Sequence, residues 1–271
     1  VEYVYLQEEK GFSLKEEETR LFSLLRGKKP SIMIIGNPNN PTGDAVSGVW
    51  IKMLADVCRE CGTFLIVDEC FNWFLEKRET YSLMPFLERD PKRFGHVMIL
   101  NAFTKIFSMA GLRFGFAVCA DLESVRLIES VRQPWGVSAP AQAGAEAALS
   151  RMDFVDETAG FVKAEREYMS RELERAGFKV YPSMTNYILF RRAEDDLADY
   201  RMRCLREGML IRSCGNFEGL DERFYRTSVR LREENRRLLN CLGRKYDASV
   251  FNPEDSRVCG GDQFGVREGL R

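Results

Sequence analysis

The sequence predicts an α/β fold in which a mainly parallel sheet forms a large domain and a smaller α+β domain follows it. Short, wholly apolar runs alternate with amphipathic helical stretches over residues 1–150. Such alternation is typical of parallel strands covered by helices. Beyond that point, a long charged helical stretch leads into a second set of short apolar runs. A chain of 271 residues is long enough for both domains.

The expected large domain contains four strands and the helices that connect them. A capping-box pattern, Ser13-Leu-Lys-Glu16, predicts the start of a first helix, which Gly27 can close. A second helix is expected over about 45–61, before Gly62, and Asp121 opens a further helix. The strands are expected at the apolar runs 31–36, 64–69, 97–101 and 113–118.

A long amphipathic helix is expected over about 154–176, before Gly177, and its length suits a bridge between two domains. The runs FKVYP, NYILF, MLIRS and FYRTSVR are expected strands of the smaller domain, with helices near 194–207 and 233–245. The final residues lack periodicity and predict a loose tail. We therefore expect a large domain at 1–150, a small domain with the bridging helix at 151–246, and the tail at 247–271.

Charge and composition exclude several classes of function. The 40 lysines and arginines nearly balance 41 aspartates and glutamates, which leaves no strong field to bind nucleic acid or an anionic membrane. No apolar run has the length of a membrane span, and the acidic N-terminal residues do not resemble a signal peptide. We therefore expect a protein of the cytoplasm whose partner is recognised by a local site.

The cysteines and the single histidine offer little chemistry. Eight cysteines are scattered without the spacing of a disulfide framework. Cys58 and Cys61 form a C-x-x-C pair in a helical stretch with no histidine nearby, so buried thiols are favoured over a redox or zinc site. His96 begins an apolar run and is expected to be structural. These features argue against a histidine-rich metal site.

Polar residues follow three of the expected strands, at the end where ligands collect in open α/β sheets. The first strand runs into the loop NPNNPTG at 37–43, the second into Asp68, and the third into Thr104-Lys105, with Arg113 eight residues on. Taken singly, these are explained as an ordinary loop, a helix cap or ion pair, and a solvated lysine. Together they bring an amide, a carboxylate, a lysine and an arginine to one rim.

The order and spacing of these segments resemble the fold type I pyridoxal-phosphate enzymes, the aspartate-aminotransferase superfamily. The superfamily pattern is NPxNPTG, then D-E-x-[FY], then [ST]-K-x-x-x-x-x-G-x-R-x-G, and it recurs here over residues 37–115. The resemblance covers about residues 1–246. It implies an aspartate-aminotransferase-like large domain with a mainly parallel sheet, a smaller α+β C-terminal domain, pyridoxal 5'-phosphate as cofactor, and a homodimer.

The resemblance also implies a role for each matching residue around the cofactor. Lys105 would form the Schiff base with the cofactor aldehyde and then act as base or acid at Cα. Asp68 would keep the pyridine nitrogen protonated. Asn40 would donate a hydrogen bond to the 3-oxygen. Thr104 and Arg113 would bind the cofactor phosphate.

Within the superfamily, the sequence is most similar to threonine-phosphate decarboxylases of cobalamin synthesis and to histidinol-phosphate aminotransferases. Phe71 occupies a cofactor-binding position where the aminotransferases typically carry a tyrosine. The segment Gln133-Pro-Trp-Gly-Val and the run from Ile211 to Arg226 resemble the decarboxylases more closely.

The same resemblance implies a set of substrate-binding residues. Arg212 would bind a substrate phosphate and Arg226 a carboxylate, and Asn186 and Trp135 complete the set. Without the resemblance, Arg212 is better explained as a surface arginine on a strand. The expected substrate is a small phosphorylated amino acid, and neither nucleic acid nor a membrane is an expected partner.

Three alternatives for function follow. The first is decarboxylation of L-threonine O-3-phosphate to (R)-1-amino-2-propanol O-2-phosphate, and the second is histidinol-phosphate aminotransferase or a related class I/II aminotransferase. The third is an inactive remnant, because the chain begins about a quarter of the way into the family pattern and is expected to lack the loop that cradles the cofactor phosphate. Decarboxylation and transamination differ only in which Cα bond stands perpendicular to the cofactor ring.

Overall fold

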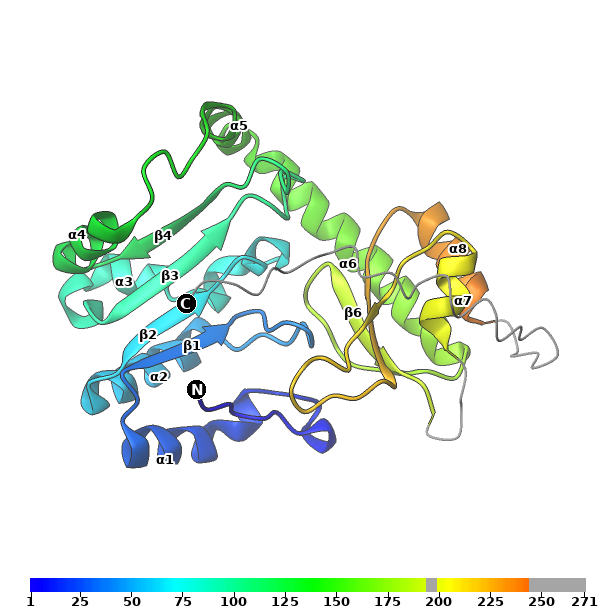
Figure 1. Ribbon diagram of the computed structural model, residues 1–271, viewed down its shortest axis with the longest axis horizontal. Helices are drawn as coiled ribbons and strands as arrows, with labels where there is room; N and C mark the ends of the chain where they lie inside the picture. The colour runs from blue at the N-terminus through cyan, green and yellow to red at the C-terminus, as the bar shows by residue number, and fades with distance from the viewer. Residues whose placement is uncertain (194–198, 244–271) are drawn as a thin grey trace, which may run out of the picture.

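The computed structural model describes residues 1–193 and 199–243, and it shows two sheets joined by a long helix (Figure 1). Sheet A consists of β1 (Ile32–Gly36), β2 (Phe64–Asp68), β3 (Val97–Ala102) and β4 (Gly115–Cys119), in that order in space. The pairings β1–β2 and β2–β3 are parallel and β3–β4 is antiparallel, so the predicted mainly parallel sheet is confirmed.

The register of sheet A places three polar loops at one edge. Gly36 lies opposite Asp68, and Asp68 lies opposite Leu100, so the three parallel strands end at nearly the same level. The loops that follow β1, β2 and β3 therefore begin side by side, as the sequence predicts for this class of sheet.

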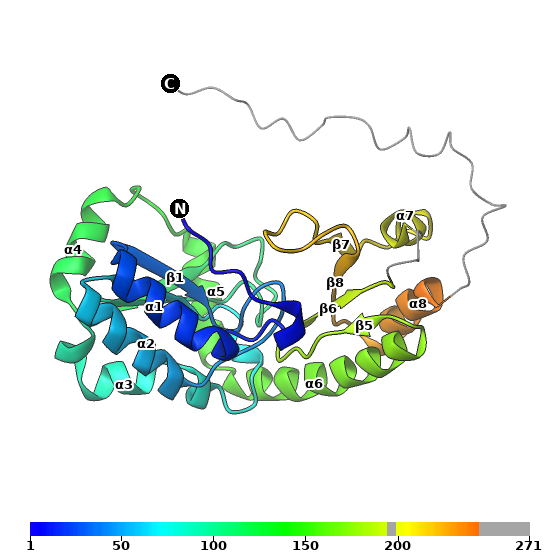
Figure 2. The same ribbon diagram turned by 90° about the horizontal axis from the view of Figure 1, so that it is seen from below.

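One face of sheet A is covered by α1 (Glu18–Lys28) and α2 (Gly48–Cys61), which lie on the same side of the sheet in Figure 2. Leu25 of α1 and Leu54 of α2 share a core cluster with Leu65 of β2 and Val97 of β3. α2 begins where Ser47 Oγ accepts a hydrogen bond from the Trp50 amide (3.2 Å), and it ends at Gly62, whose φ is +71°. The other helices of this half are α3 (Met84–Arg89), α4 (Leu122–Val131) and α5 (Ala139–Leu149).

The long helix α6 (Met152–Arg175) connects the half that contains sheet A to the half that contains sheet B (Figure 1). Its buried residues Val162, Met169 and Leu173 pack into a core cluster that includes Phe178 and Phe190. The predicted helix over 154–176 is thus confirmed, and the domain boundaries at residues 150 and 246 stay predictions.

Sheet B is antiparallel and is covered on both faces. Its strands are β5 (Lys179–Val180), β6 (Tyr187–Arg191), β7 (Arg212–Ser213) and β8 (Phe224–Ser228), in the spatial order β5-β6-β8-β7. Ile188 and Phe190 of β6 face the core cluster that contains α6 and α8 (Arg232–Leu242), whereas Leu189 belongs to a separate cluster with Phe12. The helix α7 (Tyr200–Arg206) precedes β7.

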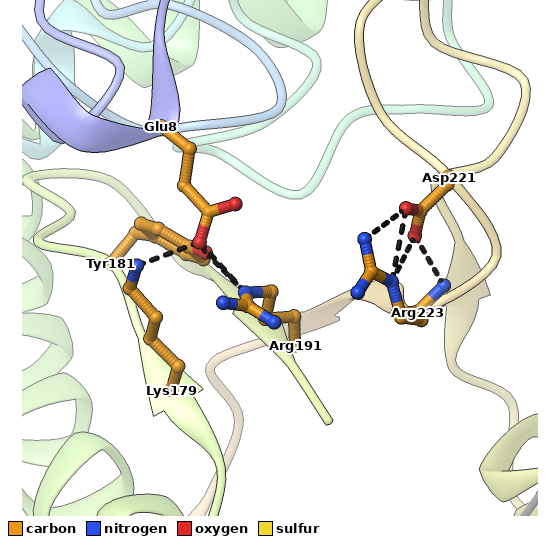
Figure 3. Close-up of polar contacts among 6 residues, drawn as sticks. All are labelled: Glu8, Lys179, Tyr181, Arg191, Asp221 and Arg223. Carbon is orange, nitrogen blue, oxygen red and sulfur yellow. Dashed lines mark hydrogen bonds and ion pairs between the residues drawn. The ribbon is translucent and has the colours of Figure 1, made fainter. Parts of the chain in front are cut away.

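The N-terminal segment covers the second face of sheet B. Glu8 accepts hydrogen bonds from Lys179 Nζ (2.6 Å) and Arg191 Nε (2.7 Å), and the Tyr181 hydroxyl also donates to it (Figure 3). Burial raises the pKa of Glu8, but these three donors outweigh it and hold the pKa at about 2. Residues near the start of the chain are therefore tied to the small-domain sheet by charge and by the packing of Phe12.

Several boundaries differ from the prediction. The first helix begins at Glu18, not at Ser13, because Lys15–Glu17 form a 3-10 turn and the Ser13 hydroxyl bonds Asp44 instead of capping a helix. That helix also runs through Gly27 to Lys28. The remaining 3-10 turns of the described chain are Glu8–Lys10, Asn72–Phe74, Arg78–Tyr81 and Pro91–Phe94.

Two further expectations reach past what the structure describes. Of the helix expected near 194–207, Tyr200–Arg206 is confirmed and residues 194–198 lie outside the described chain, as do the end of the last expected helix and the tail at 247–271. Among the described residues, none of the helices combines the length and the apolar character needed to span a membrane.

Candidate active site

The loop at 37–43 is fixed by its own asparagines and reaches toward the small domain. Asn37 is buried, and its Nδ2 donates to the carbonyl groups of Val46 (3.0 Å) and Tyr81 (2.7 Å). At the other end of the loop, Gly43 has a φ of +77°, and a Cβ there would clash with Ser183. Asn40 lies between these anchors, and its Oδ1 accepts a hydrogen bond from Arg226.

Asp68 ends β2 and has a defined orientation. Its Oδ1 accepts a hydrogen bond from the amide of Cys70 at 2.9 Å. The next residue, Glu69, is buried, accepts from Ser82 Oγ (2.7 Å) and from the amide of Leu83 (3.0 Å), and has its pKa raised to about 7 by burial. Glu69 thus holds the loop after β2 in place, while Asp68 is left at the rim of the sheet.

Lys105 lies in the loop after β3 and is exposed. Its Nζ is 6.0 Å from the centre of the Phe71 ring. Phe71 in turn makes an edge contact with Tyr187, with ring centres 5.0 Å apart. The Tyr187 hydroxyl donates to the Asn39 carbonyl (2.7 Å), so these aromatic residues join the loops of sheet A to β6 of sheet B.

Two arginines enter the site from adjacent strands of sheet B. Arg212 of β7 lies directly opposite Arg226 of β8. The Arg226 guanidinium lies over the Tyr187 ring at 4.9 Å, and that of Arg212 lies over the Phe217 ring at 4.8 Å. Burial, and then the charge of Arg212, lower the pKa of Arg226.

A cavity of about 470 Å³, called the central cavity below, lies between these groups. Among the described residues, its walls carry four cationic side chains and no carboxylate. The lining residues are Phe71, Lys105, Asn186, Tyr187, Arg201, Met202, Leu205, Leu210, Ile211, Arg212, Arg226 and Ser228. The arrangement can therefore bind an anionic molecule beside a lysine amine.

The predicted site residues divide into those that line the central cavity or act on a residue that lines it, and those for which the structure shows no such connection. Phe71, Lys105, Asn186, Arg212 and Arg226 meet at the central cavity. Asn40 does not line it but contacts Arg226. Asp68 does not line it either, but its charge acts on Tyr187, whose pKa is raised chiefly by burial.

The second group, namely Thr104, Arg113 and Trp135, does not line the central cavity. Arg113 is exposed, and its Nη1 donates to the carbonyl of Ala110 (3.0 Å). Trp135 is 97% exposed in the segment between α4 and α5. The roles implied for these three residues stay predictions.

Sequence reasoning missed several residues of the site. Tyr187 follows the predicted Asn186 directly in the NYILF run, and an aromatic residue at the start of a strand beside a site residue was a usable signal. Arg201 and the apolar residues of α7 had no such signal, because only the folded small domain brings α7 to the cavity.

Cys58 and His96 agree with a structural role, whereas Cys61 is only half-buried. Cys58 is buried, and burial raises the pKa of its thiol to about 12. The Nε2 of His96 lies 2.8 Å from the carbonyl of Ala55, and burial lowers the pKa of the ring. Within the described chain, no cluster of three or more histidine, cysteine, aspartate or glutamate side chains could hold a metal ion.

The donor set fits pyridoxal phosphate at its ring. A lysine amine lies in a cavity beside an aromatic ring, and a strand-end carboxylate and an asparagine lie nearby. The Oδ1 of Asn186 is buried in the cavity wall and has no hydrogen-bond partner among the residues that the structure describes, so a bound molecule can supply one. Arg113, the residue expected to bind the cofactor phosphate, donates a hydrogen bond to the Ala110 carbonyl of its own loop.

Comparisons with known proteins agree with this geometry. The family model "Aminotransferase class I and II" matches residues 3–242. The chain is 31% identical to the threonine-phosphate decarboxylase of Salmonella typhimurium, over 88% of this chain and 62% of that protein. It is 32% identical to histidinol-phosphate aminotransferase 1 of Cupriavidus pinatubonensis, over 79% of this chain and 55% of that protein.

A solved structure supports the same fold. The histidinol-phosphate aminotransferase from Clostridium acetobutylicum superposes with a TM-score of 0.78 and 26% identity, covering 90% of this chain and 70% of that one. The two curated relatives named above are longer than this chain, which spans 62% and 55% of their lengths. Pyridoxal 5'-phosphate is the cofactor, as the resemblance implied. Because the family model matches nearly the whole described sequence, this chain belongs to the aminotransferase class I and II family.

Proposed function

We propose that the protein is a pyridoxal-phosphate-dependent decarboxylase that converts L-threonine O-3-phosphate to (R)-1-amino-2-propanol O-2-phosphate, a step of cobalamin biosynthesis. The observation that carries the proposal is the central cavity, in which Lys105 is accompanied by arginines and by no carboxylate among the described residues. A substrate with both a phosphate and a carboxylate balances such a set of charges.

Lys105 and Asp68 are the proposed catalytic residues. Pyridoxal phosphate, when bound, supplies an electron sink for the negative charge that develops at Cα. The bond from Cα to the carboxylate carbon breaks, carbon dioxide leaves, and the Lys105 ammonium delivers a proton to Cα in its place. Asp68 holds a proton on the pyridine nitrogen, because a carboxylate beside it stabilises the cationic ring.

The other site residues bind and orient the substrate. Arg212 binds the phosphate and Arg226 the carboxylate, since the two guanidinium groups come from adjacent strands and face the same cavity. Asn40 is the proposed donor to the cofactor 3-oxygen, and its contact with Arg226 couples the two binding functions. Thr104 and Arg113 are the proposed phosphate ligands of the cofactor.

A histidinol-phosphate aminotransferase is the second candidate, and the similarity to the relatives from Cupriavidus pinatubonensis and Clostridium acetobutylicum favours it. Phe71 favours the decarboxylase instead, because the aminotransferases typically carry a tyrosine at this position. Both candidates use a phosphorylated substrate and the same lysine. They differ in whether a 2-oxo acid takes part.

The two reactions can be compared directly. The protein with bound cofactor is given L-threonine O-3-phosphate alone, and carbon dioxide release is measured. In parallel it is given histidinol phosphate with 2-oxoglutarate, and glutamate is measured. The proposal expects carbon dioxide without any 2-oxo acid, whereas glutamate formation alone would identify the aminotransferase. A protein that binds the cofactor and runs neither reaction would be an inactive remnant.

We also propose that the protein acts as a homodimer, as the family resemblance implies. Light scattering of the purified protein should give twice the mass of one chain. A mass of one chain at all concentrations would contradict this proposal.

A further inference from the structure

Arg201 of α7 lines the central cavity, although no motif in the sequence points to it. Its charge adds to those of Lys105, Arg212 and Arg226, and within the described chain no carboxylate lines the same cavity. Four cations around one cavity repel each other unless an anion lies between them. The arrangement thus indicates more negative charge in the bound molecule than one carboxylate provides.

A second cavity, of about 480 Å³, also borders Arg201, which is the residue that the two cavities share within the described part of the chain. Among the described residues, the carboxylates that line the second cavity are Glu222 and Asp199, and each accepts a hydrogen bond from a residue other than Arg201. Glu222 accepts from Ser213 Oγ (2.9 Å), and Asp199 accepts from the amide of Met202 (3.1 Å). Within residues 1–193 and 199–243, the Arg201 guanidinium has neither a hydrogen bond nor an ion pair. Arg201 is therefore available to an anion in the central cavity.

The other two arginines of the cavity already have partners. Arg226 donates to Asn40 and lies over the Tyr187 ring, and Arg212 lies over the Phe217 ring. A phosphate monoester carries nearly two negative charges and three acceptor oxygens, which is more than a single guanidinium satisfies. A second guanidinium from a different element would complete its coordination.

We propose that Arg201 binds the phosphate group of the substrate together with Arg212, and that it thereby selects phosphorylated over unphosphorylated amino acids. This inference rests on the proposed function for the class of substrate. Arg201 belongs to α7 and Arg212 to β7, and both line the central cavity. Their guanidinium groups can therefore contact different oxygens of one phosphate. Lys105 and Arg226 are then left to contact the end of the substrate at which the reaction takes place.

Binding, measured apart from turnover, tests this role. Calorimetric titrations of the full chain use O-phospho-L-threonine, L-threonine and inorganic phosphate as probes. Arg201→Gln should weaken binding of O-phospho-L-threonine about five- to tenfold and change binding of L-threonine less than about twofold, allowing for the exposure of the side chain. Arg201→Lys should restore part of the loss. Arg236→Gln, an exposed arginine of α8 that lines neither cavity, is the matched control and should change neither.

Three results would overturn the inference. Unchanged binding of O-phospho-L-threonine by Arg201→Gln would make Arg201 a surface arginine, and an equal loss for L-threonine would make its role structural. The inference also fails if the unaltered chain binds neither inorganic phosphate nor O-phospho-L-threonine at millimolar concentrations. Selective loss of phosphate binding without carbon dioxide release would support Arg201 while contradicting the proposed reaction, so the two failures are distinguishable.

Discussion

Strands β6 and β1 show how differently the two sides of the site are supported. In β6, Tyr187 and the three residues that follow are all buried, because α6 and α8 cover one face and the N-terminal segment covers the other. In β1, Ile35 is 7% exposed, but its neighbour Ile34 on the opposite face is 67% exposed. Parallel strands are usually covered on both faces. Arg212 and Arg226 therefore belong to a sheet whose strand β6 is covered on both faces, and Asp68 and the loop with Lys105 belong to a sheet whose strand β1 is covered on one face.

The largest expected effect comes from breaking the packed sheet. Phe190 is fully buried in β6, so Phe190→Ala should lower the free energy of unfolding by about 3–5 kcal/mol. Phe161→Ala is the control, because Phe161 of α6 is 43% exposed, and it should cost less than about 1 kcal/mol. Denaturant unfolding measures both variants. Equal losses would show that sheet B is not the better packed region.

On the side of the site formed by sheet A, the chemistry depends on the charge of Asp68 at the end of β2. Under the proposed function, Asp68→Asn should retain cofactor but lower turnover about 100-fold, because a neutral amide does not hold the pyridinium proton. Asp90→Asn, at an exposed aspartate in the same half, should leave turnover unchanged. Absorbance of the bound cofactor and the initial rate are measured together. Turnover of Asp68→Asn near that of the unaltered protein would eliminate this role.

The N-terminal segment should stabilise sheet B in a pH-dependent way. The folded state holds the pKa of Glu8 at about 2, below its ordinary value of 4.5, so its contribution is present above pH 4.5 and is lost as the pH falls toward 2. Glu8→Gln should therefore cost about 2 kcal/mol near pH 7, after allowance for solvent screening, and much less at pH 3. Unfolding midpoints at both pH values measure this, with exposed Glu9→Gln as control. A cost that is the same at both pH values would refute the ion-pair explanation.

The smallest expected effect is the difference in stability between substitutions on the two faces of strand β1. Ile35→Val should cost about 1 kcal/mol, because Ile35 packs against the helices that cover sheet A. Ile34→Val should change stability by less than about 0.3 kcal/mol, because little of its side chain is packed. Unfolding of the two variants in the same buffer gives the difference. A comparable cost for Ile34→Val would show that this face of β1 is covered in solution.

Much of the fold could be predicted because its signals are local. The apolar runs that became β1, β2 and β3 are short and continuous, and Ser47, Gly62 and Asp121 act as helix caps within a few residues of their own helices. Where a local signal competed with a tertiary contact, the prediction was wrong. The Ser13 hydroxyl could have capped a helix, but it bonds Asp44. Nearby, Glu17 Oε1 forms an ion pair with Lys10 Nζ at 3.0 Å.

The site was predictable where a residue lies at the end of a strand of sheet A. The ends of β2 and β3 carry Asp68 and the loop with Lys105, and motif spacing was sufficient to place both at this edge of the sheet, while their catalytic roles stay predictions. Tyr187 and Arg201 were missed because their places depend on how sheet B and α7 pack against those loops. Trp135 lies in a segment that resembles the decarboxylases, but it is almost fully exposed and does not line the central cavity.

The central claim is that Lys105 is the lysine that binds the cofactor. The protein is incubated with pyridoxal phosphate and reduced with borohydride, which fixes the cofactor covalently to its lysine, and the labelled peptide is mapped by mass spectrometry. Our account predicts label on Lys105, the one lysine that lines the central cavity within the described chain, and no specific label in Lys105→Arg. Specific label on another lysine, with Lys105 unmodified, would contradict it.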